Sequence, residues 1–146
     1  MNKTKALKLA EHPTVAITGR VENWLRDPSG RLPVSCTVLA VQDRMDGHDG
    51  IEDSWQFTSQ ALRYGAGVAI NLSALRPAGT VSPNVTASGP VSFARIYSAL
   101  NETLRRGGRF KNGAVNLHLD SHHPDAQEFV NTPVDYLPWA KRTLTV

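Results

Sequence analysis

Several stretches of the chain have the apolar, β-branched composition of strands. Residues 34–41 (VSCTVLAV) form an uninterrupted run of this kind, which predicts a buried strand. Residues 67–75 (GVAINLSAL) and 113–120 (GAVNLHLD) predict two more strands, and residues 14–19 (TVAITG) predict a shorter one. Residues 137–146 (LPWAKRTLTV) begin like a further strand.

Between these strands, apolar residues recur at helical spacing. Ile51, Trp55 and Leu62 predict a helix over residues 51–64, closed by Gly65 as its C-cap.

Two more helices are predicted nearer the C-terminus. One covers residues 90–106, and the other begins in residues 122–130 (HHPDAQEFV). In the second, Pro124 takes the first helical position, and Phe129 and Val130 face inward. The first has a single apolar stripe, made of Phe93, Ile96, Tyr97, Leu100 and Leu104.

The remaining segments are a short helix and two loops. Residues 3–11 predict a helix that Pro13 stops, and residues 26–33 (RDPSGRLP) have turn chemistry. Residues 76–89 (RPAGTVSPNVTASG) predict a long loop in which proline and glycine exclude regular structure. Because strands and helices alternate, we expect right-handed crossovers and a largely parallel sheet, hence an α/β fold.

Composition limits the function classes. The 146 residues suffice for one domain with a core, and the net charge of +3 suits phosphate ligands without predicting direct nucleic-acid binding. The single cysteine, Cys36, excludes an intramolecular disulfide and a multi-thiolate metal site. The basic start lacks the apolar core of a signal peptide, and no apolar run reaches membrane-span length, so a cytoplasmic location is expected.

Two candidate sites have a structural alternative beside the functional one. Cys36, in an apolar strand, has the surroundings of an inert core residue. The segment HLDSHHPD could hold a metal, but polar residues before a proline at a helix start are also capping chemistry, and this interpretation is favoured. The potential ligands there are His118, Asp120, His122, His123 and Asp125.

A third candidate is the glycine-rich, basic segment RRGGRFKNGA after the helix predicted to end near residue 106. Backbone N–H groups freed by glycine, together with Arg105, Arg106, Arg109 and Lys111, could hold phosphate. The alternative is a solvated loop whose basic residues suit the negative end of a helix dipole. Composition leaves these two interpretations open.

Taken together, three segments resemble a known family. PVSCTVLAVQDRMDG, YGAGVAINLSALRPAGT and the run from TASGPVSF through NLHLDSHHPDAQEFV resemble, in order and spacing, the catalytic subunit of ribonucleotide reductase, in the manner of its adenosylcobalamin-dependent class II enzymes. The resemblance covers residues 33–131. It implies about one half of a ten-stranded α/β barrel in residues 33–146, with residues 1–32 as an N-terminal helix and lead-in.

The resemblance also implies roles for individual residues. Cys36 matches the barrel cysteine that is oxidised as the ribose is reduced, and Ser35, Ser88 and Gly89 match substrate-binding positions. The effector deoxynucleotide (dNTP) is expected at Asp43 and at the segment 107–113, through Gly107, Gly108, Arg109 and Lys111. No metal ligand is implied.

The family's reaction needs thiols that this chain lacks. Two electrons come from a pair of cysteines, and a further cysteine carries a radical, whereas only Cys36 is present. The resemblance therefore implies the N-terminal portion of a split reductase, inactive without a complementing C-terminal chain and using adenosylcobalamin. Two alternatives are a non-catalytic nucleotide-binding module derived from the reductase and, more distantly, a metal-dependent hydrolase using the histidine segment.

Overall fold

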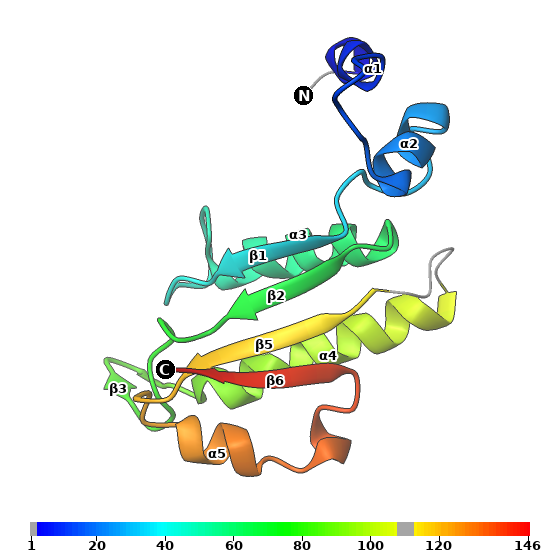
Figure 1. Cartoon of the computed structure of the whole chain (residues 1–146). Helices are drawn as coiled ribbons and strands as arrows, with labels where there is room; N and C mark the ends of the chain where they lie inside the picture. The colour runs from blue at the N-terminus through cyan, green and yellow to red at the C-terminus, as the bar shows by residue number, and fades with distance from the viewer. Residues whose placement is uncertain (1–2, 108–112) are drawn as a thin grey trace.

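The computed structural model describes residues 3–107 and 113–146 as a parallel α/β sheet with N-terminal helices extending from it (Figure 1). The helices are α1 (Lys3–Ala10), α2 (Gly19–Arg26), α3 (Ile51–Arg63), α4 (Gly89–Gly107) and α5 (Ala126–Asn131), with a 3-10 turn η1 (Val134–Tyr136). The strands are β1 (Cys36–Ala40), β2 (Gly67–Asn71), β3 (Val81–Ser82), β4 (Val85–Thr86), β5 (Val115–Asp120) and β6 (Ala140–Thr145).

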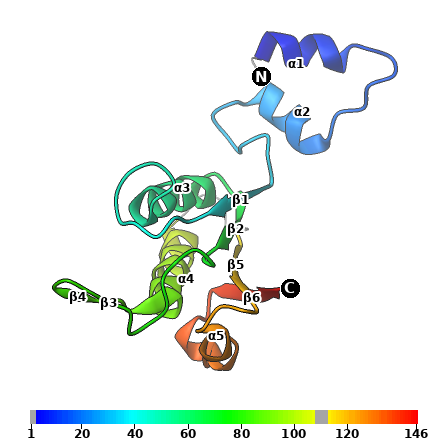
Figure 2. The ribbon, with the colours of Figure 1, turned by 90° about the vertical axis from the view of Figure 1, so that its left-hand side faces the viewer.

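Four of these strands form one sheet in the order β1-β2-β5-β6, and every neighbouring pair is parallel. Helix α3 packs on β2, α4 on β5, and α5 on β5 and β6, while α3 contacts α4 and α4 contacts α5. The helices therefore cover one face of the sheet, and Figure 2 shows that no helix of the described residues covers the other face. The α/β prediction with parallel strands is confirmed.

The core lies between the sheet and these helices. Alternate residues of β2 and β5 are buried, as a sheet packed on one face requires. Val68, Ile70 and Leu117 meet Tyr97 from α4 and Phe129 from α5 in this core. The predicted helices over 51–64 and 90–106 are confirmed, and Gly65 ends the first with the positive φ of 72° that suits a glycine C-cap.

The strand predicted at residues 14–19 is wrong, because α2 begins at Gly19. The Thr18 side chain accepts a hydrogen bond from Val21 N at 3.4 Å, as an N-cap does. Leu25 is the buried residue of this helix. Residues 15–18 have no regular structure, because none of the strands in the described residues pairs with them and β propensity alone does not make a strand.

The N-terminal segment therefore holds two helices, where one was expected. Arg20 on α2 ties this segment to the domain, donating from Nε to Leu32 O and from Nη2 to Gly65 O, each at 2.9 Å. The boundary between residues 32 and 33 stays a prediction. No helix within residues 3–107 and 113–146 is long and apolar enough to cross a membrane.

The loop predicted without regular structure contains the β3–β4 hairpin. Ser82 pairs with Val85 across Pro83 and Asn84, and Asn84 has a φ of 74°. Proline followed by asparagine at positive φ suits a type II turn, so the residues expected to prevent regular structure form the hairpin's turn.

Two predictions of burial are wrong. The run 34–41 predicts a buried strand, but β1 is an edge strand whose Cys36, Val38 and Ala40 are exposed. Helix α5 begins at Ala126, two residues after Pro124, and only Phe129 of the two residues expected to face inward is buried. Val130 is 51% exposed, because a six-residue helix has room for only a narrow buried stripe.

Candidate functional site

Ser35 and Cys36 lie at the start of β1, and both are exposed. Cys36 is therefore not the inert core residue that its apolar strand predicts. Gly67 lies directly opposite on β2, where its N–H donates to Ser35 O at 2.7 Å. A Cβ built on Gly67 would be 3.8 Å from the Cys36 sulfur, so this glycine leaves the thiol open on the uncovered face of the sheet.

A second group of predicted site residues surrounds a hollow of about 330 Å³ beyond the carboxyl end of β1. Its wall includes Asp43, Arg76, Ser88 and Gly89. Arg76 Nε donates to Asp43 Oδ2 at 2.6 Å, and Arg76 Nη1 donates to Ser82 Oγ at 3.1 Å. The lining is mainly apolar apart from this ion pair, so the hollow can hold a flat organic group beside a cation.

Gly89 gives this hollow its shape. Its φ is 76°, and a Cβ there would lie 2.6 Å from Asp125 Oδ2 and 2.8 Å from the Cβ of Ala78. The buried Asp125 carboxylate accepts a hydrogen bond from Ala78 N at 2.8 Å, which fixes the loop after β2 against the start of α5. Asp125 is therefore a positioning residue here.

The structure divides the predicted residues into two groups. Asp43, predicted to contact the effector, shares one hollow with Ser88 and Gly89, predicted to contact substrate. Ser35 and Cys36 lie at the other end of β1, a strand of five residues that spans about 16 Å. Of the segment 107–113, Gly107 ends α4 and Gly113 is buried, whereas Gly108, Arg109 and Lys111 lie outside the described residues.

The histidine segment does not gather into a metal site. His123 Nδ1 accepts from Asp125 N at 3.0 Å, so Nε2 is the atom that donates to Leu75 O at 2.8 Å. His118 Nε2 lies 3.1 Å from the Asn116 amide. The backbone N–H and side chain of His122 bond to Asp120 and lower the pKa of that carboxyl. These nitrogens serve local hydrogen bonds, which agrees with the favoured interpretation as turn and cap chemistry.

Sequence reasoning missed Arg76 as a functional candidate. It lies 33 positions from Asp43, and the motif NLSALRPAG offers no charge pattern that would single it out. These two residues meet because β1 and β2 are parallel, so the loops that follow them leave the sheet together at the carboxyl ends of the strands.

Comparisons with known proteins agree with this fold. A model of the ribonucleotide reductase barrel domain matches residues 34–136. The class Id ribonucleotide reductase alpha subunit of Actinobacillus ureae superposes with a TM-score of 0.68 at 16% identity, covering 88% of this chain and 23% of that one. This likeness supports the partial barrel expected from the sequence.

The relatives include enzymes named for their cofactor. The vitamin B12-dependent ribonucleotide reductase of Streptomyces avermitilis is 36% identical over 108 residues, which are 73% of this chain and 11% of that protein. The vitamin B12-dependent ribonucleoside-diphosphate reductase of Mycobacterium tuberculosis is 36% identical over 106 residues, 71% of this chain and 15% of that protein. This chain thus corresponds to a small part of these relatives, and it belongs to the ribonucleotide reductase family through its barrel domain.

Proposed function

We propose that this chain is the N-terminal portion of a split ribonucleotide reductase. It would contribute one redox thiol, substrate-side residues and an effector site to the reduction of ribonucleotides to deoxyribonucleotides. The observation that carries the proposal is the exposure of Cys36 beside Gly67 on the uncovered face of a parallel sheet of this family.

Electron balance requires a second thiol. Replacing the ribose 2′-hydroxyl by hydrogen releases water and consumes two electrons, which two thiols supply when they become a disulfide. Cys36 is the only cysteine of this sequence, so its disulfide partner would come from the complementing chain. Ser35, adjacent to Cys36, would contact the same ribose.

The hollow at Asp43 and Arg76 would hold the effector. A dNTP has a flat base for the apolar wall, a hydroxyl that the Asp43 carboxylate can accept a hydrogen bond from, and phosphates that suit the Arg76 guanidinium. Ser88 and Gly89, which line the same hollow, support nucleotide binding there, and a substrate role for them remains part of the proposal.

Adenosylcobalamin does not fit the described part of this chain. Five hollows of the described residues measure about 230 to 430 Å³ each, and a corrinoid is several times bulkier than the ligands that hollows of this size accommodate. The cofactor expected from the relatives would therefore be held largely by the complementing chain.

The decisive experiment mixes this chain with a complementing C-terminal reductase chain, adenosylcobalamin, a ribonucleotide and a dithiol. Deoxynucleotide should form only when both chains are present, and Cys36→Ser should abolish it. If the complementing chain alone gives the same rate, or if no deoxynucleotide forms with both chains, the proposal fails.

The second candidate is a non-catalytic nucleotide-binding module derived from the same family. One observation favours it: Asp43 and Arg76 form an ion pair in the wall of a mainly apolar hollow, which offers a nucleotide both an apolar surface and a cation. Calorimetry with each of the four dNTPs on the chain alone distinguishes the two, because micromolar binding without any deoxynucleotide formation after complementation supports the module.

A further inference from the structure

The loop after β2 is held on both sides of Arg76 by two residues at the start of α5. His123 Nε2 donates to the carbonyl of Leu75 at 2.8 Å, and Asp125 Oδ2 accepts from Ala78 N at 2.8 Å. Leu75 directly precedes Arg76, and Ala78 follows it by two positions. The backbone that carries the guanidinium is therefore fixed by hydrogen bonds that span 48 and 47 positions of the sequence.

The two residues also bind each other, and we call them the α5 clamp. Asp125 N donates to His123 Nδ1 at 3.0 Å, so Nε2 carries the proton that the bond to Leu75 needs. Phe129 N donates to Asp125 O at 2.9 Å in the first turn of α5, and the Phe129 ring is fully buried. The α5 clamp is thus fixed to the core.

Arg76 has little freedom of its own. Pro77 follows it, and a residue before proline is largely restricted to extended backbone. The guanidinium donates to Asp43 and to Ser82, which uses two of its five N–H groups and leaves others for an anion in the hollow that it lines. The position of this cation therefore depends on what holds its loop.

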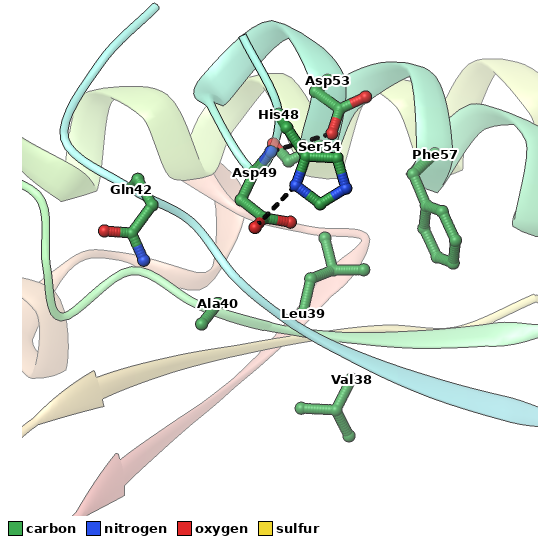
Figure 3. Close-up of a pocket in the computed structure, with 9 residues that line it drawn as sticks. All are labelled: Val38, Leu39, Ala40, Gln42, His48, Asp49, Asp53, Ser54 and Phe57. Atoms are coloured by element: carbon green, nitrogen blue, oxygen red, sulfur yellow. Dashed lines mark hydrogen bonds and ion pairs between the residues drawn. The ribbon is translucent and has the colours of Figure 1, made fainter.

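The Asp43 side of the hollow is held independently, by the first turn of α3 (Figure 3). Asp53 Oδ2 accepts from Asp49 N at 3.0 Å, and Gln42 N, next to Asp43, donates to Asp49 O at 2.8 Å. His48 Nδ1 pairs with Asp49 Oδ2 in the same turn. Within the described residues, the α5 clamp makes no hydrogen bond to this loop, so breaking the clamp should release Arg76 and leave Asp43 in place.

We propose that His123 and Asp125 are positioning residues for the ligand of the hollow at Asp43 and Arg76. They hold Arg76 where its guanidinium binds an anionic group, and neither of them lines the hollow. A charge-assisted hydrogen bond depends on the direction of its donors, and ordering a released loop on binding costs affinity. The identification of the anion as the triphosphate of a dNTP rests on the proposed function, whereas the hold on Arg76 rests on the hydrogen bonds of this chain.

Calorimetry on the full chain tests whether the clamp acts through Arg76. The ligand is whichever of the four dNTPs the parent chain binds most tightly. His123→Leu removes both hydrogen bonds of the imidazole and should weaken dNTP binding by about fivefold or more. In the Arg76→Ala background the same change should weaken binding by less than about twofold, because no guanidinium remains to be positioned.

Conservative variants separate the lost hydrogen bonds from a general loss of packing. His123→Gln should recover most of the affinity, because its amide can donate to the same carbonyl. Asp125→Asn keeps an oxygen for the N–H of the loop and should bind like the parent, unlike Asp125→Ala. His122→Leu is the matched control, because His122 is 85% exposed and bonds to Asp120. Circular dichroism confirms that each variant is folded, and the His123 series suffices if Asp125→Ala does not fold.

A second measurement needs no nucleotide. The Nε–H of Arg76, bonded to Asp43 at 2.6 Å, should give a separate side-chain signal in a proton–nitrogen NMR spectrum, assigned by its loss in Arg76→Lys. Its hydrogen exchange should be about tenfold faster in His123→Leu than in the parent and in His122→Leu, because the released loop opens more often.

Three outcomes overturn the inference. They are equal weakening by His123→Leu in the parent and Arg76→Ala backgrounds, parental affinity in a folded His123→Leu, and an Arg76 signal that exchanges at the parental rate in that variant. Failure of the proposed effector site gives a different result. The parent chain then binds no dNTP, while the Arg76 signal still exchanges faster in His123→Leu, which leaves the positioning role standing.

Discussion

Asp43 and Arg76 join the loops that follow two adjacent parallel strands. Arg76 Nε donates to Asp43 Oδ2 at 2.6 Å, and the same guanidinium reaches Ser82 in the β3–β4 hairpin. Because Ala40 and Asn71 are register partners at the ends of β1 and β2, both loops leave the sheet at the carboxyl end of its parallel strands. The ion pair therefore closes one side of the hollow in which we place the effector.

This pair should matter more for ligand binding than for stability. The two side chains are 42% and 33% exposed, so Asp43→Asn should lower the free energy of unfolding by at most about 1 kcal/mol. If the pair orients Arg76 toward a nucleotide phosphate, the same change should weaken dNTP binding at least tenfold. Urea unfolding and calorimetry measure the two effects separately.

Glu22→Gln is the matched control, because it removes the exposed pair of Glu22 with Arg26 on α2, away from the hollow. It should change neither quantity by more than the experimental error. Unaltered nucleotide affinity in Asp43→Asn would exclude a role for the pair in binding.

Gly89→Ala should destabilise the protein strongly. The new Cβ would lie 2.6 Å from Asp125 Oδ2 and 2.8 Å from Ala78, and the backbone would keep a φ of 76° that alanine adopts only with strain. Overpacking and strain together should cost about 3 kcal/mol in urea unfolding.

Gly19→Ala is the matched control for the stability of Gly89→Ala. Gly19 begins α2, and its added Cβ would meet nothing within 4 Å, so this variant should be as stable as the parent or slightly more so. Equal stabilities of the two variants would show that the close approach at Gly89 does not constrain the fold.

The regular part of the fold could be predicted because its signals are local. Ile51, Trp55 and Leu62 repeat at helical spacing, and Gly65 ends the helix with the backbone geometry that glycine allows. The alternation of strands and helices then implied the parallel sheet. The helical spacing and the C-cap depend on residues within one or two turns of each other, and the parallel sheet needs only the order of the elements along the chain.

The candidate site depended on contacts that local patterns do not contain. The apolar run around Val38 predicts cover on both faces of the strand, whereas the described helices cover only one. The pairing of Asp43 with Arg76 needs the order of strands in the sheet, and the contact of Asp125 with Ala78 joins loops 47 residues apart. Spacing in the sequence cannot reveal either contact before the topology is known.

The ionisation of Tyr97 should lower the stability of the protein as pH rises above 10. Burial raises the pKa of its phenol to about 12, against which a hydrogen bond with Ser54 acts. The phenol of an unfolded chain ionises near its ordinary pKa of 10.0, so the unfolded state gains stability first as pH rises. The contribution of Tyr97 is therefore complete below pH 10 and is lost as pH rises toward 12.

Tyr97→Phe tests this dependence. It should cost about 1 kcal/mol at pH 8 through the lost hydrogen bond to Ser54, and the deficit should shrink above pH 10, where the parent protein loses the contribution of its phenol. Tyr64→Phe, at an exposed ring, serves as the control. A deficit that stays constant from pH 8 to pH 11.5 would contradict the burial of Tyr97 as a neutral phenol.

Replacement of Cys36 should affect the reaction without affecting the stability of the fold. Because its side chain is exposed beside Gly67, the native thiol should react with a disulfide reagent at pH 8 nearly as fast as the unfolded thiol does. Cys36→Ser should change the free energy of unfolding by less than about 0.5 kcal/mol, as surface substitutions usually do. In the two-chain assay it should nevertheless eliminate deoxynucleotide formation, while dNTP binding to the chain persists.

Ser35→Ala is the control, because it keeps the thiol and should react with the reagent at the parent's rate. A native thiol that reacts orders of magnitude more slowly than the unfolded one would restore the inert core cysteine, and the proposed redox role would then have no accessible sulfur.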